Sequence, residues 1–211
     1  MLDAAQLTEI KTPPIRHNVW VSEILILARV RLRETDLPVV ADYYFEVDKR
    51  HSQSEGSYGL SVWRDTKDPE SFLVAYEYAD LAAADRGLVA ISEVRYLAET
   101  ELIDFKPAHV LRVRVHGRDG KRLSQTPQSA SLSMSVRVAD PGYGPELLEE
   151  LGRVFDELQL ITGHLGSVYG TNDGLDEEVI GIATWIGPDA LKKSLPRKAG
   201  ASTLELYTRF F

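Results

Sequence analysis

The sequence predicts an α+β protein that consists of two tandem ferredoxin-like units, each with the element order βαββαβ. The main observation is that the second half repeats the order of elements in the first half. Each half has an arginine on its first strand, Arg29 or Arg137, and an aromatic residue at the end of a later strand, Tyr78 or Trp185. With 211 residues, the chain is long enough for two small units that each bury a core.

We expect four segments along the chain. A cluster of Gly, Pro, Ser, Gln and Thr between the two halves has the composition of a linker. Near the N-terminus, Pro13-Pro14 favours an extended segment over a helix. The expected segments are an extension at 1–20, a first ferredoxin-like unit at 21–117, a linker at 118–130 and a second unit at 131–211.

The first unit begins with a strand whose two faces are both apolar, as expected for a strand that is covered on both sides. Its first helix places Val40, Tyr43, Tyr44 and Val47 on one stripe, the spacing of an amphipathic helix. The expected elements are a strand at 23–32, a helix capped by Asp36 and running to Arg50, a hairpin of strands 60–64 and 72–78, a helix capped by Asp80 and running towards Leu102, and a strand at 109–116.

The second unit follows the same plan, with the strongest helical periodicity of the chain after Pro145. We align its residues 166–168 with the Gly-Ser-Tyr turn at 56–58. The glycines from Gly163 to Gly174 do not precede a Lys-Ser/Thr pair, so we interpret them as a turn and not as a phosphate loop. The expected elements are a strand at 131–138, a helix at 145–161, the glycine-rich turn, a strand at 178–186, a short helix at 189–195 and a strand at 203–210.

Composition excludes several classes of function. A net charge of -8 leaves no excess of Lys and Arg for binding nucleic acid. The absence of cysteine excludes disulfides and thiolate chemistry, and no His and carboxylate cluster has the spacing of a metal site. The N-terminal segment lacks the features of a signal peptide, and no apolar run is long enough for a membrane span, so we expect a cytoplasmic protein with no membrane partner.

Four short motifs in the first half carry a resemblance to a known family. They are Ile-Leu-Ala-Arg-Val at 26–30, Glu-Gly-Ser-Tyr-Gly-Leu at 55–60, Arg-Asp-x-x-Asp-Pro at 64–69 and Phe-Leu-Val-x-Tyr-Glu-Tyr-x-Asp at 72–80. In these motifs the chain resembles the antibiotic biosynthesis monooxygenase-like dimeric α/β barrel proteins. The resemblance implies that two ferredoxin-like sheets pack face to face. Here one chain would supply both sheets as an intrachain pseudo-dimer, and two chains could still form a homodimer.

The resemblance also implies a kind of chemistry. Some members of that family oxidise aromatic polyketides or quinols without metal or flavin, and others degrade heme with an Asn, Trp and His set. The Trp position of that set corresponds to Tyr78 and Trp185 here, whereas its His position falls near Gly87 and Ser194, and neither first strand has an Asn. The heme-degrading set is therefore absent. We expect a cofactor-independent monooxygenase-like protein that acts on a small aromatic or quinone-like molecule.

Three residues are candidates for catalysis. His51 could act as a base, although a histidine near a helix C-terminus is also favourable with the helix dipole. Arg29 could hold an anionic or phenolate oxygen, or it could lie at the rim of the sheet. Tyr78 stands at the strand position that carries Trp in relatives, and Glu77 beside it would be a base if burial raised its pKa.

Six further residues are candidates for ligand binding, through aromatic walls or through charge. Aromatic side chains could line a cavity for a flat substrate, or they could simply pack in the core. His164 could instead be an axial heme ligand, as in chlorite dismutase-like proteins with two such units. The alternatives to an enzyme are a non-catalytic ligand-binding or stress-related protein and a heme-binding protein. The six candidates are Tyr58, Trp63, Tyr76, Arg137, His164 and Trp185.

Overall fold

The computed structural model describes residues 23–31, 37–101, 109–195 and 203–211. The expected N-terminal extension at 1–20 and the expected helix cap at Asp36 lie outside these ranges.

Each half of the chain forms one βαββαβ unit, which confirms the predicted α+β class and the duplication. A short 3₁₀ helix, η1 (Leu123–Gln125), lies between the units. The first unit comprises β1 (Ile24–Arg31), α1 (Leu37–Ser52), β2 (Ser57–Asp65), β3 (Ser71–Tyr78), α2 (Leu81–Glu101) and β4 (Val110–Gly120). The second comprises β5 (Ser131–Val138), α3 (Gly144–Leu158), β6 (His164–Asn172), β7 (Leu175–Trp185), α4 (Pro188–Ser194) and β8 (Thr203–Arg209).

The eight strands form one closed antiparallel barrel in the order β1-β3-β2-β8-β5-β7-β6-β4. Within it, each unit keeps the ferredoxin-like order, β4-β1-β3-β2 in the first and β8-β5-β7-β6 in the second. The pairs β2·β8 and β4·β6 join the units. Because both edges of each sheet are paired in this way, the strands in the described part of the chain include no unpaired edge. A single chain therefore forms the pseudo-dimer.

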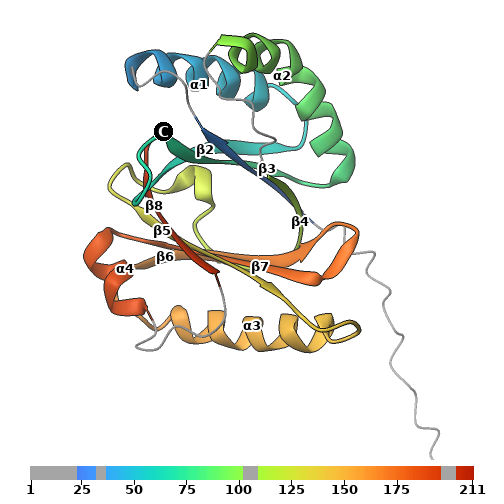
Figure 1. Cartoon of the computed structure of the whole chain (residues 1–211), viewed down its shortest axis with the longest axis vertical. Coiled ribbons are helices and arrows are strands. Elements are labelled where there is room, and N and C mark those ends of the chain that lie inside the picture. The colour runs from blue at the N-terminus through green and yellow to red at the C-terminus, as the bar shows by residue number, and fades with distance from the viewer. Residues whose placement is uncertain (1–22, 32–36, 102–108, 196–202) are drawn as a thin grey trace, which may run out of the picture.

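The two sheets face each other, and the helices cover their outer faces (Figure 1). Helices α1 and α2 lie over the sheet of unit 1, and α3 and α4 lie over that of unit 2. Apolar side chains fill the space between the sheets, including Leu25, Leu73, Leu132 and Ile180, and Leu123 of η1 belongs to the same cluster. Separate apolar clusters lie under each pair of helices. Each strand is thus covered on both faces, as the apolar pattern of the first strand predicts.

The strand register corrects the predicted equivalence of Arg29 and Arg137. Ile24 of β1 and Ser131 of β5 are equivalent, because each pairs with the aromatic residue that ends β3 or β7. Arg29 lies five residues after Ile24, whereas Arg137 lies six residues after Ser131. Side chains alternate between the faces of a strand, so a shift of one residue puts the two arginines on opposite faces.

The glycine-rich stretch at 163–174 was predicted as a turn, and this prediction is wrong, because most of it forms β6. Its glycines allow close contact with neighbouring backbone. A Cβ atom at Gly166 would collide with the backbone of Lys121, and one at Gly170 with the carbonyl oxygen of Arg114. Glycine inside a strand is typical where another backbone approaches closely. These glycines therefore let β6 pair with β4 and close the barrel.

The glycine that corresponds to Gly56 is Gly163, and the predicted alignment with residues 166–168 is wrong by three positions. Both glycines have positive φ, +81° and +94°, and each precedes the first residue of β2 or β6. A Cβ atom at Gly56 would lie 2.6 Å from Cβ of Ala83, and one at Gly163 would lie 2.7 Å from Cβ of Ala190. The next helix of each unit thus packs against this turn in the same way.

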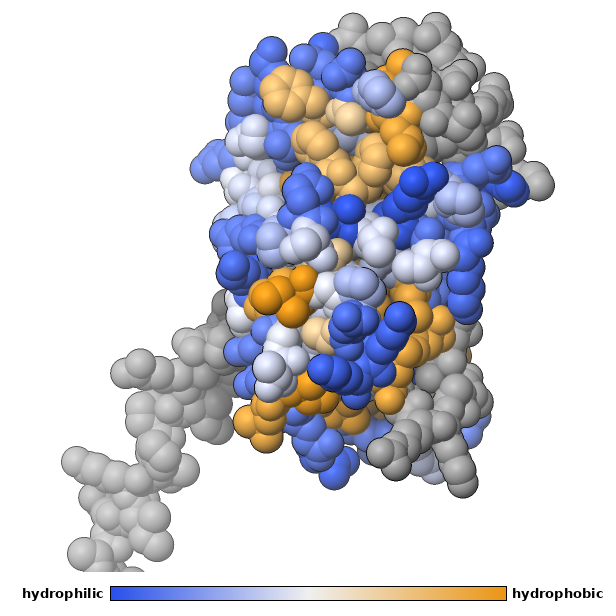
Figure 2. Space-filling view, turned by 90° about the vertical axis from the view of Figure 1, so that its left-hand side faces the viewer, coloured by the Kyte–Doolittle hydropathy of each residue, from blue (hydrophilic) through white to orange (hydrophobic). Residues whose placement is uncertain are grey.

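Among the described helices, none is both long enough and apolar enough to cross a membrane. On the face shown in Figure 2, hydrophilic residues cover much of the surface, with hydrophobic residues exposed between them in both units.

Candidate functional site

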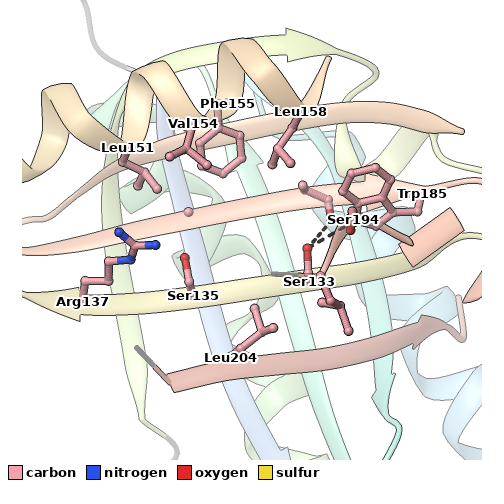
Figure 3. Close-up of a pocket in the computed structure, with 13 residues that line it drawn as sticks. Ser133, Ser135, Arg137, Leu151, Val154, Phe155, Leu158, Trp185, Ser194 and Leu204 are labelled. Atoms are coloured by element: carbon pink, nitrogen blue, oxygen red, sulfur yellow. Dashed lines mark hydrogen bonds between the residues drawn. The ribbon is translucent and has the colours of Figure 1, made fainter. Parts of the chain in front are cut away.

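A cavity of about 300 Å³ lies in unit 2, between the outer face of the sheet and helices α3 and α4 (Figure 3). One wall comes from α3 and is apolar, and the floor comes from β5, β7 and β8. The lining residues are Leu151, Val154, Phe155 and Leu158 of α3, Ser133, Ser135 and Arg137 of β5, Gly181, Ala183 and Trp185 of β7, Leu204 of β8, and Ser194 and Leu195 at the end of α4.

Small residues on β7 make room for the cavity. By register, Gly181 and Ala183 occupy the positions of Val74 and Tyr76 in β3 of unit 1. Both unit 1 residues are buried in the core under α1 and α2. At Gly181, an added Cβ atom would lie 2.7 Å from Cε2 of Phe155, so only glycine lets this ring approach the sheet so closely. The strand β7 therefore lacks the two large side chains that β3 places under the helices of unit 1, and the cavity lies beside these small residues.

The strand β5 gives the cavity a polar floor, whereas the equivalent face of β1 is apolar. Residues at alternate positions of a strand share one face, and the register aligns the two strands residue by residue. The outward-facing residues of β1 are Ile24, Ile26, Ala28 and Val30, and those of β5 are Ser131, Ser133, Ser135 and Arg137. The two units thus share the fold, but β5 has three hydroxyls and a guanidinium at the positions where β1 has hydrocarbon side chains.

Trp185 is held in place at one end of the cavity. Its indole Nε1 donates a hydrogen bond of 3.2 Å to Oγ of Ser133, and Ser133 donates one of 3.5 Å to the carbonyl oxygen of Ala183. Both bonds are visible in Figure 3. Because Trp185 is fully buried and its polar atom is bonded, the ring forms a fixed wall rather than a mobile lid.

Arg137 stands at the opposite end of the cavity floor from Trp185 (Figure 3). Its Nη1 lies 3.6 Å from Oε1 of Glu150, and the side chains of Arg137 and Glu150 are 30% and 59% exposed. Its Nε is buried and has no hydrogen-bond partner among the described residues. An exposed ion pair at this distance contributes little to stability, and a buried donor without a partner is unfavourable. The guanidinium can therefore bind an anionic group in the cavity.

His164, a predicted ligand-binding residue, contacts the cavity only indirectly. Its ring packs edge-on against Trp185, with the ring centroids 5.4 Å apart. Burial lowers the pKa of His164, although the charge of Asp119 acts in the opposite direction. Its Nε2 is buried without a hydrogen-bond partner among the described residues. His164 does not line the cavity itself.

The structure brings together His51, Tyr76 and Tyr78, but it packs them in the core of unit 1. His51 is fully buried in α1, with Nδ1 2.8 Å from Oγ of Ser57 and its ring 4.9 Å from that of Tyr78. The Tyr76 ring lies 5.4 Å from His51. Burial lowers the pKa of His51 to about 4, so the imidazole is neutral at pH 7. A second edge-on pair of His and an aromatic residue thus occurs in unit 1.

Arg29 lies inside the barrel and not on the outer face that forms the cavity. Its Nε and Nη2 donate hydrogen bonds of 3.0 and 2.5 Å to the two carboxylate oxygens of Glu205. The hydroxyl of Tyr207 donates a bond of 2.5 Å to the same carboxylate. Burial, followed by the bond to Glu205, raises the pKa of Tyr207. Arg29 is therefore paired within the protein, in contrast to Arg137.

Tyr58 and Trp63, also predicted as ligand-binding residues, belong to the barrel end and the barrel interior. The guanidinium of Arg122 lies 3.8 Å from the centre of the half-exposed Tyr58 ring, a cation-π contact. Trp63 is fully buried between the sheets, and its Nε1 donates a 2.9 Å hydrogen bond to Oγ of Ser61. Of the nine predicted site residues, the structure places Arg137 and Trp185 in the lining of the cavity.

Glu77, considered as a base, is 1% exposed and holds parts of the barrel together. Its Oε1 lies 3.0 Å from Nη2 of Arg118 and 3.8 Å from Nη1 of Arg122. Its Oε2 accepts a 2.9 Å hydrogen bond from the backbone N–H of Ser124 in η1. Glu23 also pairs with both arginines. This network fixes η1 to the barrel and does not line the cavity.

Sequence reasoning missed most of the cavity floor, namely Ser133, Ser135, Gly181, Ala183 and Leu204. A signal for the first two exists, because β5 alternates Ser with apolar residues whereas the matching strand of unit 1 has only apolar residues there. No signal marks Gly181, because its contact with Phe155 depends on how α3 crosses the sheet. The described residues include no group of three or more His, Asp or Glu that could hold a metal.

No protein-family model matches the sequence, and no curated protein matches it. Solved structures match its fold over most of its length. A candidate monooxygenase from Fusobacterium nucleatum matches with a TM-score of 0.74 and 12% identity, covering 91% of this chain and 94% of that one. A candidate monooxygenase from Lactobacillus acidophilus gives 0.72 and 11%, covering 90% and 95%. An anthrone oxidase-like protein gives 0.62 and 14%, covering 89% and 91%.

These matches span both units and therefore include the closed barrel as well as a single ferredoxin-like unit. They confirm the dimeric α/β barrel fold that was expected from the resemblance to antibiotic biosynthesis monooxygenase-like proteins. At these identities the similarity concerns the fold, and the chemistry has to be argued from the cavity.

Proposed function

We propose that this protein is a cofactor-independent, monooxygenase-like enzyme that acts on a small aromatic or quinone-like molecule in the unit 2 cavity. The observation that carries the proposal is the cavity itself, which is apolar along α3 and has Arg137 at one end. A mostly apolar cavity of this size with a few placed polar groups is typical of small-molecule sites. Fold neighbours described as monooxygenases and as anthrone oxidase-like support the same class of chemistry.

The proposed reaction hydroxylates the ring of a quinol with dioxygen. For 1,4-dihydroxynaphthalene, one atom of O₂ becomes a hydroxyl on the ring of the product quinone, and the other leaves as water. The substrate supplies all four electrons, two when the quinol becomes a quinone and two when the ring carbon is hydroxylated. No further reductant is needed.

The lining residues have distinct roles in this proposal. Arg137 holds an anionic oxygen of the substrate, because a nearby cation favours the charged form of an acidic group. Phe155 and Trp185 confine the flat ring between α3 and β7 and exclude water. The described lining contains no imidazole or carboxylate, so the substrate proton leaves to water at the partly exposed Arg137 end.

The lining residues do not fit heme. An axial ligand to iron would have to be a side chain such as histidine, and His164 packs against Trp185 outside the described lining. The proposed reaction therefore does not involve heme. An absorption spectrum after heme addition tests this directly, since a stable Soret band that His164→Ala abolishes would reverse the argument.

Oxygen uptake with 1,4-dihydroxynaphthalene tests the proposed reaction. With ¹⁸O₂, we expect one labelled oxygen atom in the product quinone and uptake faster than the spontaneous rate without protein. Gly181→Val should return uptake to the spontaneous rate, because Val, the residue at this position in unit 1, would push the Phe155 ring into the cavity. Unlabelled quinone together with hydrogen peroxide would contradict monooxygenation.

The absence of a base among the described lining residues favours a second candidate, a protein that binds such a molecule without converting it. The same experiment separates the two candidates. Binding that Gly181→Val weakens, with oxygen uptake at the spontaneous rate, would support the binding protein and refute the enzyme.

A further inference from the structure

The guanidinium of Arg137 has an unused hydrogen-bonding edge at the cavity. Glu150 approaches Nη1 at 3.6 Å, so it does not occupy the side of the group that contains Nε. Nε is buried and has no partner among the described residues. Arg118 and Arg209 also have one such buried nitrogen, but Arg137 is the one of the three that lines the cavity. A desolvated N–H at a cavity wall needs an acceptor, and a ligand in the cavity can supply one.

The same chain shows what this edge of an arginine binds. In Arg29, Nε and Nη2 together hold both oxygens of the Glu205 carboxylate, at 3.0 and 2.5 Å. This parallel arrangement of two N–H groups against two oxygens is the strong geometry for arginine and carboxylate. A phenolate has one oxygen, which can accept from both donors only in a bent, bifurcated arrangement and not as two parallel bonds. The free edge of Arg137 therefore fits a carboxylate better than a phenolate.

We propose that the cavity selects an aromatic carboxylate, which Arg137 binds through Nε and Nη2 while the ring lies against Phe155 and Leu151. This inference rests on the proposed function, because it names the class of substrate for the same cavity. The ring-facing wall of α3 is hydrocarbon, so the charged group of the ligand has Arg137 as its cationic partner in the described lining. Ser135 lies two residues before Arg137 on the same face of β5 and offers a hydroxyl to an oxygen substituent on the ring.

Glu150 allows a second test of the proposal, in which a substitution should strengthen the binding of a carboxylate and not weaken it. Its carboxylate competes with the ligand for the guanidinium and repels an incoming anion, but it is mostly exposed and its contact with Arg137 is long. Removing its charge should therefore tighten the binding of a carboxylate. It should have no such effect on an uncharged ring.

The test measures binding by calorimetry with 6-hydroxy-2-naphthoate, its methyl ester and 2-naphthol. We expect the acid to bind at least tenfold more tightly than the ester or the naphthol. Arg137→Met should weaken the acid roughly 10- to 100-fold, because it removes charge-assisted hydrogen bonds, and should leave the ester unchanged. Glu150→Gln should tighten the acid a few-fold. Arg153→Met is the control, because it removes the same charge from an exposed position of α3.

The outcomes separate this inference from the proposed function. If the ester and the naphthol bind as tightly as the acid, and Gly181→Val abolishes all three, the cavity is the site but the carboxylate preference is refuted. If the acid preference persists in Arg137→Met, another cation binds the carboxylate and the inference fails. If binding is insensitive to Gly181→Val, the cavity is not the site and the proposed function fails as well. None of these readouts needs turnover, because 6-hydroxy-2-naphthoate is not a quinol.

Discussion

The sharpest prediction concerns Gly181. Its substitution by valine, the residue at the equivalent position of unit 1, should close the unit 2 cavity. In Gly181→Val, the new Cβ would lie 2.7 Å from Cε2 and 2.9 Å from Cζ of Phe155. Carbon atoms pack best at about 3.5 to 4.0 Å, so the ring has to move by roughly 1 Å. The space into which it can move is the cavity, which it already lines. We therefore expect ligand binding to fall at least tenfold.

The effect on stability should be small, because two contributions oppose each other. Inserting extra methyl groups into a packed core costs about 1 to 3 kcal/mol. Replacing a strand glycine by a residue that prefers strands stabilises the folded protein by about 0.5 to 1 kcal/mol. The expected net loss is up to about 2.5 kcal/mol, which for a chain of this size lowers Tm by no more than roughly 10 °C.

A matched control comes from unit 1, where Val74 stands at the equivalent position. Val74→Ala removes two buried methyl groups, so it should cost about 2 kcal/mol of stability and leave ligand binding unchanged. Calorimetric titration with 6-hydroxy-2-naphthoate and thermal unfolding measure both quantities. The reasoning is refuted if folded Gly181→Val binds as tightly as the original protein, or if Val74→Ala weakens binding to the same extent.

Three further predictions concern stability away from the cavity. Burial lowers the pKa of His51 from its ordinary value of 6.5 to about 4 in the folded state, so the unfolded state binds more protons between these two pH values. Stability should thus fall by about 3 kcal/mol from pH 7 to pH 4, and urea midpoints of His51→Gln should lose that part of the pH dependence. Glu77→Gln should cost about 1 to 3 kcal/mol in urea unfolding, because Arg118 loses a buried partner at 3.0 Å but keeps Glu23; a loss below 1 kcal/mol would contradict this role. Tyr207→Phe should cost about 1 to 2 kcal/mol without changing ligand binding, since it removes only a bond to Glu205 inside the barrel.

Hydrophobic periodicity predicted most elements because it records which face of each element is buried. The amphipathic stripe of Val40, Tyr44 and Val47 does lie buried in α1. The prediction of a turn at 163–174 is wrong because glycines are usual in turns and so favour that interpretation. Its glycines instead allow the close approach of β6 and β4, a contact between segments about 50 residues apart in the chain.

Candidate site residues were harder to predict, because residue type does not reveal the face of a strand unless the register is known. Arg29 and Arg137 look equivalent in the sequence, yet one pairs with Glu205 inside the barrel and the other lines the cavity. His51 and Tyr78 have the chemistry of a site but fill a core. An error of one residue in the alignment of two strands exchanges an arginine in an internal ion pair for an arginine that lines the cavity.

The α+β class, the repeated βαββαβ unit and the order of the elements could be predicted from the sequence, because they depend on local propensity and on the spacing of apolar residues. The cavity under the helices of unit 2 could not, because it depends on tertiary packing. The cavity arises where Gly181 and Ala183 on β7 face Phe155 on α3, and its charge arises because the register turns Arg137 outward. Packing volume and strand register are properties of residues brought together from distant parts of the chain, and no single segment encodes them.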